Sequence, residues 1–378
     1  MALSDSDVIS AVAAQQQAIA DTVAFVHAHP ELGHEEHACA AHLAGRLAEA
    51  GLQVEEKVAG LDTAFRASLQ GGRAGRRVGI VAQYDAVAAV REDGSVDAVH
   101  SCGHGPIAGS VLGVALALAS LRSELAGELV VIGCPADEIH APGTIELGGG
   151  KWLTAAAGVW DDCDAALYAH PEFIDTVSQA SLWMRRDTFR VAGARSLRDD
   201  VAQGPLDAIH TLLHTAGEIS RSRLMLEGLV LDGDVEEGTG LVLSGTLLYF
   251  ADDEAGIDST AAALRAALPD AVWETGRLVP GIRPDDAVTA AVADAFRAAG
   301  HGFEPDPPPL PFATDFGSIS GRVPSALIGV GRAEGWSFHS DEGAAQFASS
   351  DGLDAAATMA TVLALAAVRL SEPGSDPA

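Results

Sequence analysis

Short strands that are apolar over their whole length alternate with helices along most of this chain of 378 residues. The clearest of these strands are expected at residues 78–87, 128–135, 165–169 and 326–330. A strand that is apolar on both faces needs cover on both, because sheets built from such strands lie between two layers of helices. The alternation therefore predicts an α/β domain whose sheet is covered by helices.

Apolar residues at helical spacing predict the helices that cover this sheet. We expect these helices at Asp5–Ala28, Glu35–Ala50, Ile107–Leu121, Arg283–Gly300 and Leu353–Leu370. Pro106 is expected at the first position of its helix, where a missing N–H costs nothing. No apolar run is expected to reach the roughly 20 residues of a membrane span, because the longest, 107–121, is interrupted by glycines and a serine.

The stretch from residue 181 to 281 has a different order of elements. Its pattern predicts a strand at 187–193, a helix at 205–220, strands at 226–231 and 241–250, a helix at 257–268 and a last strand at 271–274. The order β-α-β-β-α-β is the ferredoxin-like arrangement. We therefore expect a larger α/β domain of residues 1–180 and 282–378, with a ferredoxin-like α+β domain of residues 181–281 inserted into it.

The composition excludes two classes of partner. The chain has 53 Asp and Glu against 23 Lys and Arg, a formal net charge of −30. Nucleic-acid-binding proteins present a basic face, and proteins that dock on anionic membranes use basic clusters. The four cysteines show no CxxC spacing and the N-terminus has no secretory signal, so we expect a cytoplasmic protein with reduced thiols.

Side chains that bind metal ions follow each of the predicted strands. They are Cys102 and His104, Asp137 and Glu138, His170, and His339. In an open α/β sheet, ligands bind outside the carboxyl ends of the strands, so these side chains should meet at one edge. Thiolate, imidazole and carboxylate are the groups that hold zinc, manganese and similar ions. The sequence therefore predicts a metal centre at this edge.

Several motifs, taken together, resemble the M20 family of metallopeptidases and amidohydrolases. The closest branch has aminoacylase-like, aminobenzoyl-glutamate hydrolase-like and β-alanyl-dipeptidase-like members. The matching motifs are HPELGHEE (His29–Glu36), AQYDAV (Ala82–Val87), SCGHG (Ser101–Gly105), PADE (Pro135–Glu138), GGGKW (Gly148–Trp152), DDCDAALYAHPE (Asp161–Glu172), PLDA (Pro205–Ala208), ATDFGSIS (Ala313–Ser320) and the late His339.

The resemblance implies a zinc-peptidase-like catalytic domain that binds metal, built on a mixed sheet covered by helices, with the inserted domain as a lid that often mediates a homodimer. Leu241–Phe250 alternates apolar and polar residues only weakly and is the candidate edge strand for this pairing. It implies a centre of two divalent ions, Zn or Mn with Ni or Co as alternatives. The implied ligands are Cys102, His104, Glu138, His170 and His339. The residue before the ligand Glu acts in the family as a general base toward the activated water, and here that residue is Asp137. A carboxylate in this place can take up a proton and return it to a leaving amine.

This sequence departs from the family pattern in three places. The usual base is Glu, and Asp137 is one methylene shorter. Gly105 stands where the family commonly has Asp or Asn. The lid commonly carries a His that holds an oxyanion, but the corresponding loop, 193–204, has none, so Arg195 or Arg198 is the candidate electrostatic partner.

Three further residues are candidates for substrate binding. His140 follows the ligand Glu138 by two positions and is placed to line a pocket. Thr314 and Asp315 lie in a loop that the family places at the substrate end. Asp85 has two interpretations, one near the site and one as a capping residue of its loop. The run Gly148–Gly150 lacks the spacing of a phosphate loop and is not interpreted as one.

The function expected from these features is hydrolysis of an amide C–N bond by a metal-activated water. The substrate would be an N-acyl amino acid, a dipeptide or an aryl-amide conjugate. One alternative is hydrolytic removal of an amino group from an aromatic or heterocyclic ring. The other is a non-hydrolytic protein that binds a small molecule on the same scaffold, and it rests on the shorter base and the missing lid histidine.

Overall fold

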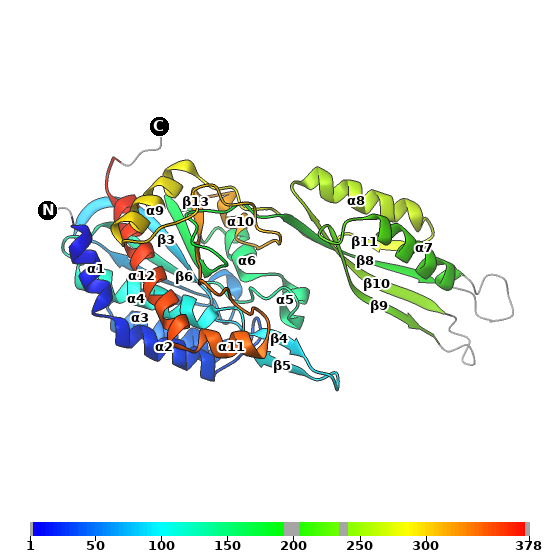
Figure 1. Cartoon of the computed structure of the whole chain (residues 1–378), viewed down its shortest axis with the longest axis horizontal. Coiled ribbons are helices and arrows are strands. Elements are labelled where there is room, and N and C mark those ends of the chain that lie inside the picture. The colour runs from blue at the N-terminus through cyan, green and yellow to red at the C-terminus, as the bar shows by residue number, and fades with distance from the viewer. Residues whose placement is uncertain (1–2, 193–203, 234–240, 375–378) are drawn as a thin grey trace. The chain divides into compact units, whose positions relative to one another are not determined.

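The computed structural model describes residues 3–192, 204–233 and 241–374, and its chain divides into two compact units (Figure 1). Unit 1 contains residues 1–180, 282–308 and 315–378, and unit 2 contains residues 181–281 and 309–314. The segment Pro309–Thr314 thus groups with unit 2, whereas the sequence analysis assigned it to the larger domain. Arg195 and Arg198 lie outside the described residues.

Unit 1 is built on a mixed six-stranded sheet with the order β1-β2-β6-β3-β7-β13. These strands are β1 (Gln53–Glu56), β2 (Phe65–Gln70), β3 (Arg73–Ala82), β6 (Ala126–Gly133), β7 (Ala165–Pro171) and β13 (Ser325–Val330). β6, β3, β7 and β13 pair in parallel, whereas β1 and β2 run antiparallel at one side. The expected α/β fold with a mixed sheet is confirmed, and the four parallel strands are those predicted from the apolar runs.

The first predicted strand ends earlier than expected. β3 stops at Ala82, and the next residues leave the sheet before the chain forms a separate hairpin of β4 (Val87–Val90) and β5 (Val96–Val99). The hydrophobic residues do not reveal this break, because Tyr84 and Ala86 are as buried as the last residues of β3 although they lie outside any strand. Asp85, a buried polar residue, lies three residues beyond the end of β3.

The helices of unit 1 pack around this sheet (Figure 1). They are α1 (Asp5–Ala13), α2 (Gln16–Ala28), α3 (His37–Glu49), α4 (His104–Ser120), α5 (Pro142–Leu147), α6 (Gly150–Ala156), α9 (Asp286–Ala298), α10 (Gly317–Ser320), α11 (Asp341–Phe347) and α12 (Ser350–Ser371), with a short 3₁₀ turn at Val58–Gly60. Two corrections follow. The first predicted helix is two helices, α1 and α2, and α4 begins at His104, so Pro106 occupies its third position rather than its first.

Helix α12 corrects the expectation about long apolar runs. It has 22 residues and a mean hydropathy of 1.6, enough to cross a membrane by length and composition, and 67% of that stretch is buried inside the protein. Its neighbours in unit 1 include α4, α9 and α1. A helix that is apolar on nearly all sides and covered by other helices behaves as the core helix of a folded domain.

Unit 2 has an antiparallel sheet with the order β11-β8-β10-β9, and β12 pairs beside β11 on β8. Its elements are β8 (Trp183–Ala192), α7 (Gly204–Glu218), β9 (Leu224–Asp232), β10 (Val242–Ala251), α8 (Glu254–Ala267), β11 (Val272–Glu274) and β12 (Leu278–Val279). β8 and β10, the first and third strands in chain order, occupy the centre, as in a ferredoxin-like sheet. The predicted fold class of the insertion is therefore confirmed.

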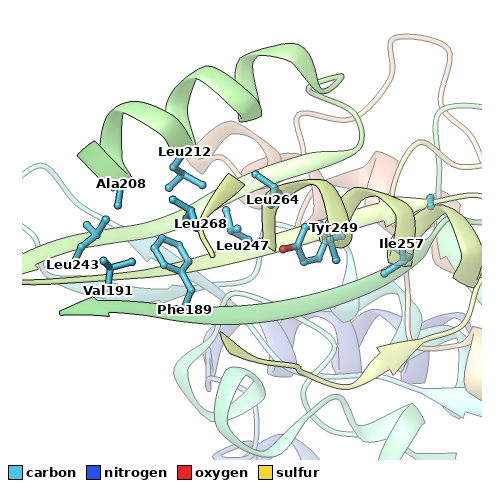
Figure 2. Packing of buried hydrophobic residues seen from close by; sticks show 12 residues of the cluster. Phe189, Val191, Ala208, Leu212, Leu243, Leu247, Tyr249, Ile257, Leu264 and Leu268 are labelled. Atoms are coloured by element: carbon cyan, nitrogen blue, oxygen red, sulfur yellow. The ribbon is translucent and has the colours of Figure 1, made fainter. Parts of the chain in front are cut away.

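The core of unit 2 lies between this sheet and its two helices (Figure 2). The apolar side chains come from alternate positions of β8 and β10 and from the inner faces of α7 and α8. Examples are Phe189, Val191, Leu243, Leu247, Leu212 and Leu264. Because these residues pack against one another within the unit, unit 2 has a hydrophobic core of its own.

Strand β10 is central in this sheet, between β8 and β9. The weak alternation of apolar and polar residues over Leu241–Phe250 predicts an exposed edge strand instead. That interpretation is wrong, since both faces of β10 carry buried residues, including Leu247 and Leu248. The edge strand on that side is β9, which exposes several apolar side chains: Met225, Leu226, Val230 and Leu231.

Candidate metal centre

Among the residues that the structure describes, two overlapping groups of metal-binding side chains lie in unit 1, and both contain Cys102. One consists of Cys102, His104 and His170, and the other of Cys102, Glu138 and His339. Within each group the potential ligand atoms lie within 4.8 Å of one another. All five side chains that the family resemblance implies as ligands are thus brought together, although residues 102 and 339 are far apart in the sequence.

The fold explains why these side chains meet. β3, β6, β7 and β13 are parallel, so their carboxyl ends lie at the same edge of the sheet. Glu138 follows β6, His170 lies near the end of β7, and His339 follows β13. His104 is the first residue of α4, and Cys102 lies two residues before it.

Asp85 orients two of these ligands. The Nδ1 atom of His104 lies 2.7 Å from the carbonyl oxygen of Asp85 and 3.0 Å from its Oδ1. Both neighbours are acceptors, so the ring proton belongs on Nδ1 and Nε2 keeps its lone pair for a ligand bond. The Oδ2 atom of Asp85 accepts a hydrogen bond of 2.9 Å from the backbone N–H of Glu138.

The other two histidines also turn Nε2 toward Cys102. The Nδ1 atom of His170 lies 2.6 Å from the carbonyl oxygen of Pro171, and its Nε2 is 3.7 Å from the Cys102 sulfur. The Nε2 atom of His339 is 3.4 Å from the same sulfur and 3.7 Å from Glu138 Oε2. His339 has a φ of +57°, and its backbone N–H is held by the carbonyl of Ser101 at 2.9 Å.

The donor atoms fit a pair of divalent ions. His104 Nε2 and Glu138 Oε1 are buried and make no hydrogen bond, an unfavourable state for polar atoms unless a ligand engages them. Burial, together with the charges of Asp85 and Asp137, raises the pKa of Glu138 to about 7 even though His104 opposes it. Burial alone would lower the pKa of His104, but the carboxylates of Asp85 and Asp137 raise it. The raised pKa values of Glu138 and His104 both indicate a pocket with excess negative charge, which a cation would neutralise.

Asp137 has a different set of partners from the ligands. Its Oδ1 forms an ion pair with the ammonium of Lys151, and its Oδ2 lies 3.4 Å from His104 Nε2. Burial would raise the pKa of Asp137, but the charge of the Lys151 ammonium holds it well below its usual range. One oxygen of this carboxylate is therefore held by Lys151, while the other faces the ligand cluster.

Asp315 lies on the far side of Lys151. Its Oδ1 is 2.8 Å from Lys151 Nζ, and its Oδ2 accepts a hydrogen bond of 3.0 Å from the backbone N–H of Trp152 at the start of α6. Gly149, just before α6, makes this approach possible, and Gly150 lets the first residue of α6 lie against Pro135. A Cβ at Gly149 would lie 2.2 Å from Asp315 Oδ2, and one at Gly150 would lie 2.1 Å from the carbonyl oxygen of Pro135.

Comparison with known proteins settles the family. The model of peptidase family M20/M25/M40 matches residues 79–366 of this chain. The chain belongs to this family. Over 173 residues it is 30% identical to one of the subunits of p-aminobenzoyl-glutamate hydrolase from Escherichia coli K12, covering 43% of this chain and 34% of the relative. Over 178 residues it is 29% identical to thermostable carboxypeptidase 2 of Saccharolobus solfataricus, covering 44% of this chain and 43% of that protein. The matches span less than half of the length of these relatives.

Solved structures of M20 proteins share the fold along nearly the whole chain. A putative aminohydrolase from methicillin-resistant Staphylococcus aureus superimposes with a TM-score of 0.74 at 18% identity, covering 98% of this chain and 100% of that one. A dinuclear metal-binding peptidase of the M20 family from Bacillus subtilis gives a TM-score of 0.70 at 18% identity, covering 95% and 99%. At these identities the likeness establishes the fold of this M20 chain and not its substrate.

A cavity of about 490 Å³ adjoins the ligand cluster of this M20 protein. It lies between the β4–β5 hairpin and the loop that carries His339, and it includes Glu138 and His140. His140 is exposed and lines this cavity, as the sequence predicted for a pocket residue. Its role in substrate binding stays a prediction.

The other candidate substrate residues have different positions. Asp315 is buried, with 5% of its surface exposed, and both of its oxygens have partners within unit 1. Thr314 belongs to the segment that groups with unit 2. Arg195 lies outside the described residues.

Three supporting residues become evident only in the folded chain. In the sequence, Lys151 stands out only as part of the GGGKW motif, and Asp85 has two interpretations, one near the site and one as a capping residue. A signal for Lys151 was present, because it is one of only two lysines in the chain, the other being Lys57. Glu36 also supports the site, since its Oε1 accepts the N–H of Ala136 at 2.7 Å, next to Asp137.

Proposed function

We propose that this M20 chain is a metal-dependent hydrolase that cleaves an amide C–N bond. The observation that carries the proposal is the pair of ligand groups sharing Cys102, with the carboxylate of Asp137 beside them but outside both groups. Cys102, His104, Glu138, His170 and His339 would hold two divalent ions, and Zn or Mn suits these donors.

The contacts in the site indicate separate roles for the bound ions, for Asp137 and for Asp85. A bound divalent ion lowers the pKa of a water molecule toward neutrality and polarises a carbonyl group. Asp137 would accept a proton at Oδ2, the oxygen that faces the cluster, and return it to the nitrogen of the leaving group. Asp85 would keep His104 and Glu138 in orientation through the contacts described above.

The proposed substrates are N-acyl amino acids, dipeptides and aryl-amide conjugates. The names of the relatives support this range, since they include a p-aminobenzoyl-glutamate hydrolase, carboxypeptidases and a mouse Xaa-Arg dipeptidase that is 33% identical over 156 residues. These compounds share an amide or peptide bond next to a carboxylate-bearing group.

A substrate panel tests the proposal. The protein loaded with Mn or Zn is incubated with acyl-amino acids, dipeptides and p-aminobenzoyl-glutamate, and both the released amine and the released acid are measured. Ammonia released from an aromatic amine without an acid product would instead indicate hydrolytic deamination. An absence of turnover with full metal content would contradict the proposal and favour a non-hydrolytic binding protein.

We also propose that the protein is a homodimer that pairs through unit 2. Strand β9 is an edge strand with exposed apolar residues, and an exposed edge is a surface on which a second strand can pair. Val230 is 58% exposed there. A second copy of the chain offers the same strand and the same side chains.

The dimer should depend on this edge and not on the opposite one. Val230→Lys places a charge on the pairing edge, so we expect light scattering to show a dimer for the wild type at micromolar concentration and a monomer for this variant. Val272→Lys is the matched control, because Val272 is 75% exposed on β11 at the other side of the sheet. A monomeric wild type, or equal effects of both variants, would contradict the assignment.

A cytoplasmic location completes the proposal. All four cysteines are free thiols, and Cys102 must remain reduced to serve as a metal ligand. A reducing compartment provides that condition. Cell fractionation with an antibody against the chain would test this location.

A further inference from the structure

Lys151 is buried in unit 1, with 0% of its side chain exposed. Only two of the 23 basic residues are lysines, and the other, Lys57, lies at the surface with 65% of its side chain exposed. Fully buried lysines are rare in folded proteins unless their charge is compensated. The position of Lys151 beside the ligand cluster therefore needs a specific explanation.

The charge of Lys151 is compensated by carboxylates on both sides. Its ammonium contacts Asp137 Oδ1 and lies 2.8 Å from Asp315 Oδ1, and it lies 5.1 Å from the centre of the Tyr168 ring. Burial alone would lower the pKa of Lys151, but the charges of Asp137 and Asp315 raise it, so the side chain remains an ammonium. As a donor without acceptor capacity, it fixes the oxygens that it contacts.

Asp315 is itself fixed by the backbone. Its second oxygen accepts the N–H of Trp152, and the absence of a side chain at Gly149 leaves the space that this carboxylate occupies. The chain of contacts thus runs from the start of α6 through Asp315 and Lys151 to Asp137. Lys151 contacts Oδ1 of Asp137, which leaves the other oxygen of this carboxylate, Oδ2, facing the ligand cluster.

We propose that Lys151 and Asp315 are positioning residues that hold the short carboxylate of Asp137 with Oδ2 directed at the ligand cluster. The inference rests on the proposed function, in which Asp137 accepts the proton. An aspartate is one methylene shorter than the glutamate usual in this family, so its carboxylate has less reach and its orientation matters more. Lys151 supplies that orientation without itself contacting the reacting atoms.

A spectroscopic experiment tests the contacts without any substrate. Because the chain has only two lysines, protein labelled with ¹³C and ¹⁵N lysine should give two side-chain ammonium signals. We expect the Lys57 signal to behave as solvent-exposed and the Lys151 signal to be shifted and protected from hydrogen exchange. Asp315→Asn and Asp137→Asn should each move the Lys151 signal and leave the Lys57 signal in place. Two signals with the same exchange rate, or a Lys151 signal insensitive to both variants, would overturn the proposal.

A kinetic experiment tests the positioning role. Lys151→Met should keep the metal content and KM of the wild type but lose kcat roughly 10²-fold, the scale expected when a catalytic group is displaced by about 1 Å. Lys57→Met is the matched control and should leave kcat unchanged. If Lys151 acts through Asp137, the double variant Asp137→Asn/Lys151→Met should be no slower than Asp137→Asn alone. An unchanged kcat in Lys151→Met, or losses that multiply in the double variant, would overturn the proposal.

Two additions to these experiments separate a folding defect from loss of the positioning role, and failure of the proposed function from failure of this inference. Lys151→Met leaves two buried carboxylates without their cation and is expected to lower stability, so Lys151→Met/Asp315→Asn, which preserves the net charge, replaces it if the single variant does not fold. This double variant should show the same loss of kcat with normal metal content, and a normal kcat would refute the role. If the wild type hydrolyses no amide, the proposed function fails, and the ammonium signals still decide whether Lys151 holds Asp137.

Discussion

Asp137→Asn is expected to retain both metal ions and lose kcat by roughly 10²–10⁴-fold, the usual contribution of general acid–base catalysis. The asparagine keeps the size of the side chain and removes its ability to accept a proton. The five predicted ligands are untouched, because Asp137 belongs to neither group of metal-binding side chains. Metal analysis and steady-state kinetics on the same preparation would measure both quantities.

Asp137→Glu is the matched control because it restores the charge. We expect it to be faster than Asp137→Asn but slower than the wild type, since Lys151 already contacts Oδ1 and the added methylene must displace either Lys151 or the contact with His104. A kcat equal to or above the wild type would show that the site has room for a longer base. An Asp137→Asn protein with near-normal kcat would end the general-base assignment.

Cys102→Ser is expected to lower the content of both metal ions and to abolish activity. Cys102 is the one side chain that both ligand groups share, and a serine hydroxyl is a much poorer ligand than a thiolate.

His170→Ala and His339→Ala each remove a ligand from one group only, so each should lower the affinity for one ion by about tenfold or more while the other ion is retained. Metal-to-protein ratios after dialysis against a chelator would separate these patterns.

Cys163→Ser provides the control for a general effect of removing a thiol. Cys163 is buried and belongs to neither ligand group, so its loss should leave the metal content unchanged. Alkylation of the wild type should be slowed by bound metal, because the thiol of Cys102 would then be engaged. Full metal content and rate in Cys102→Ser would refute its role as a ligand.

The strands of unit 1 were predictable where burial of both faces requires an apolar sequence. β6, β7 and β13 are apolar along most of their length, and each lies where the pattern predicts a strand. Residues 83–86 are equally buried without being in a strand, so hydrophobicity could not locate the end of β3. The edge position predicted for β10 is wrong because periodicity indicates which face of a strand is covered and carries no information about which strands lie beside it.

The metal ligands were predictable because their chemistry is rare and their places follow the strands. Their supporting residues were not, since Asp85 and Lys151 act through contacts that only the folded chain creates. Asp315 illustrates the difference. The family resemblance places its loop at the substrate end, whereas its carboxylate is buried against Lys151 and the start of α6.

The chain enters and leaves the insertion of residues 181–281 at adjacent points. A Cβ at Gly281 would lie 2.4 Å from the carbonyl oxygen of Ser181, and β12, near the end of the insertion, pairs with the beginning of β8. An insertion with neighbouring ends behaves as a module, because its removal or exchange leaves only a short gap in the host. All five predicted metal ligands belong to the host. Evolution could therefore have exchanged or reshaped the module while the ligand set stayed intact, and protein engineers could graft a different module at residues 181 and 281 by the same route.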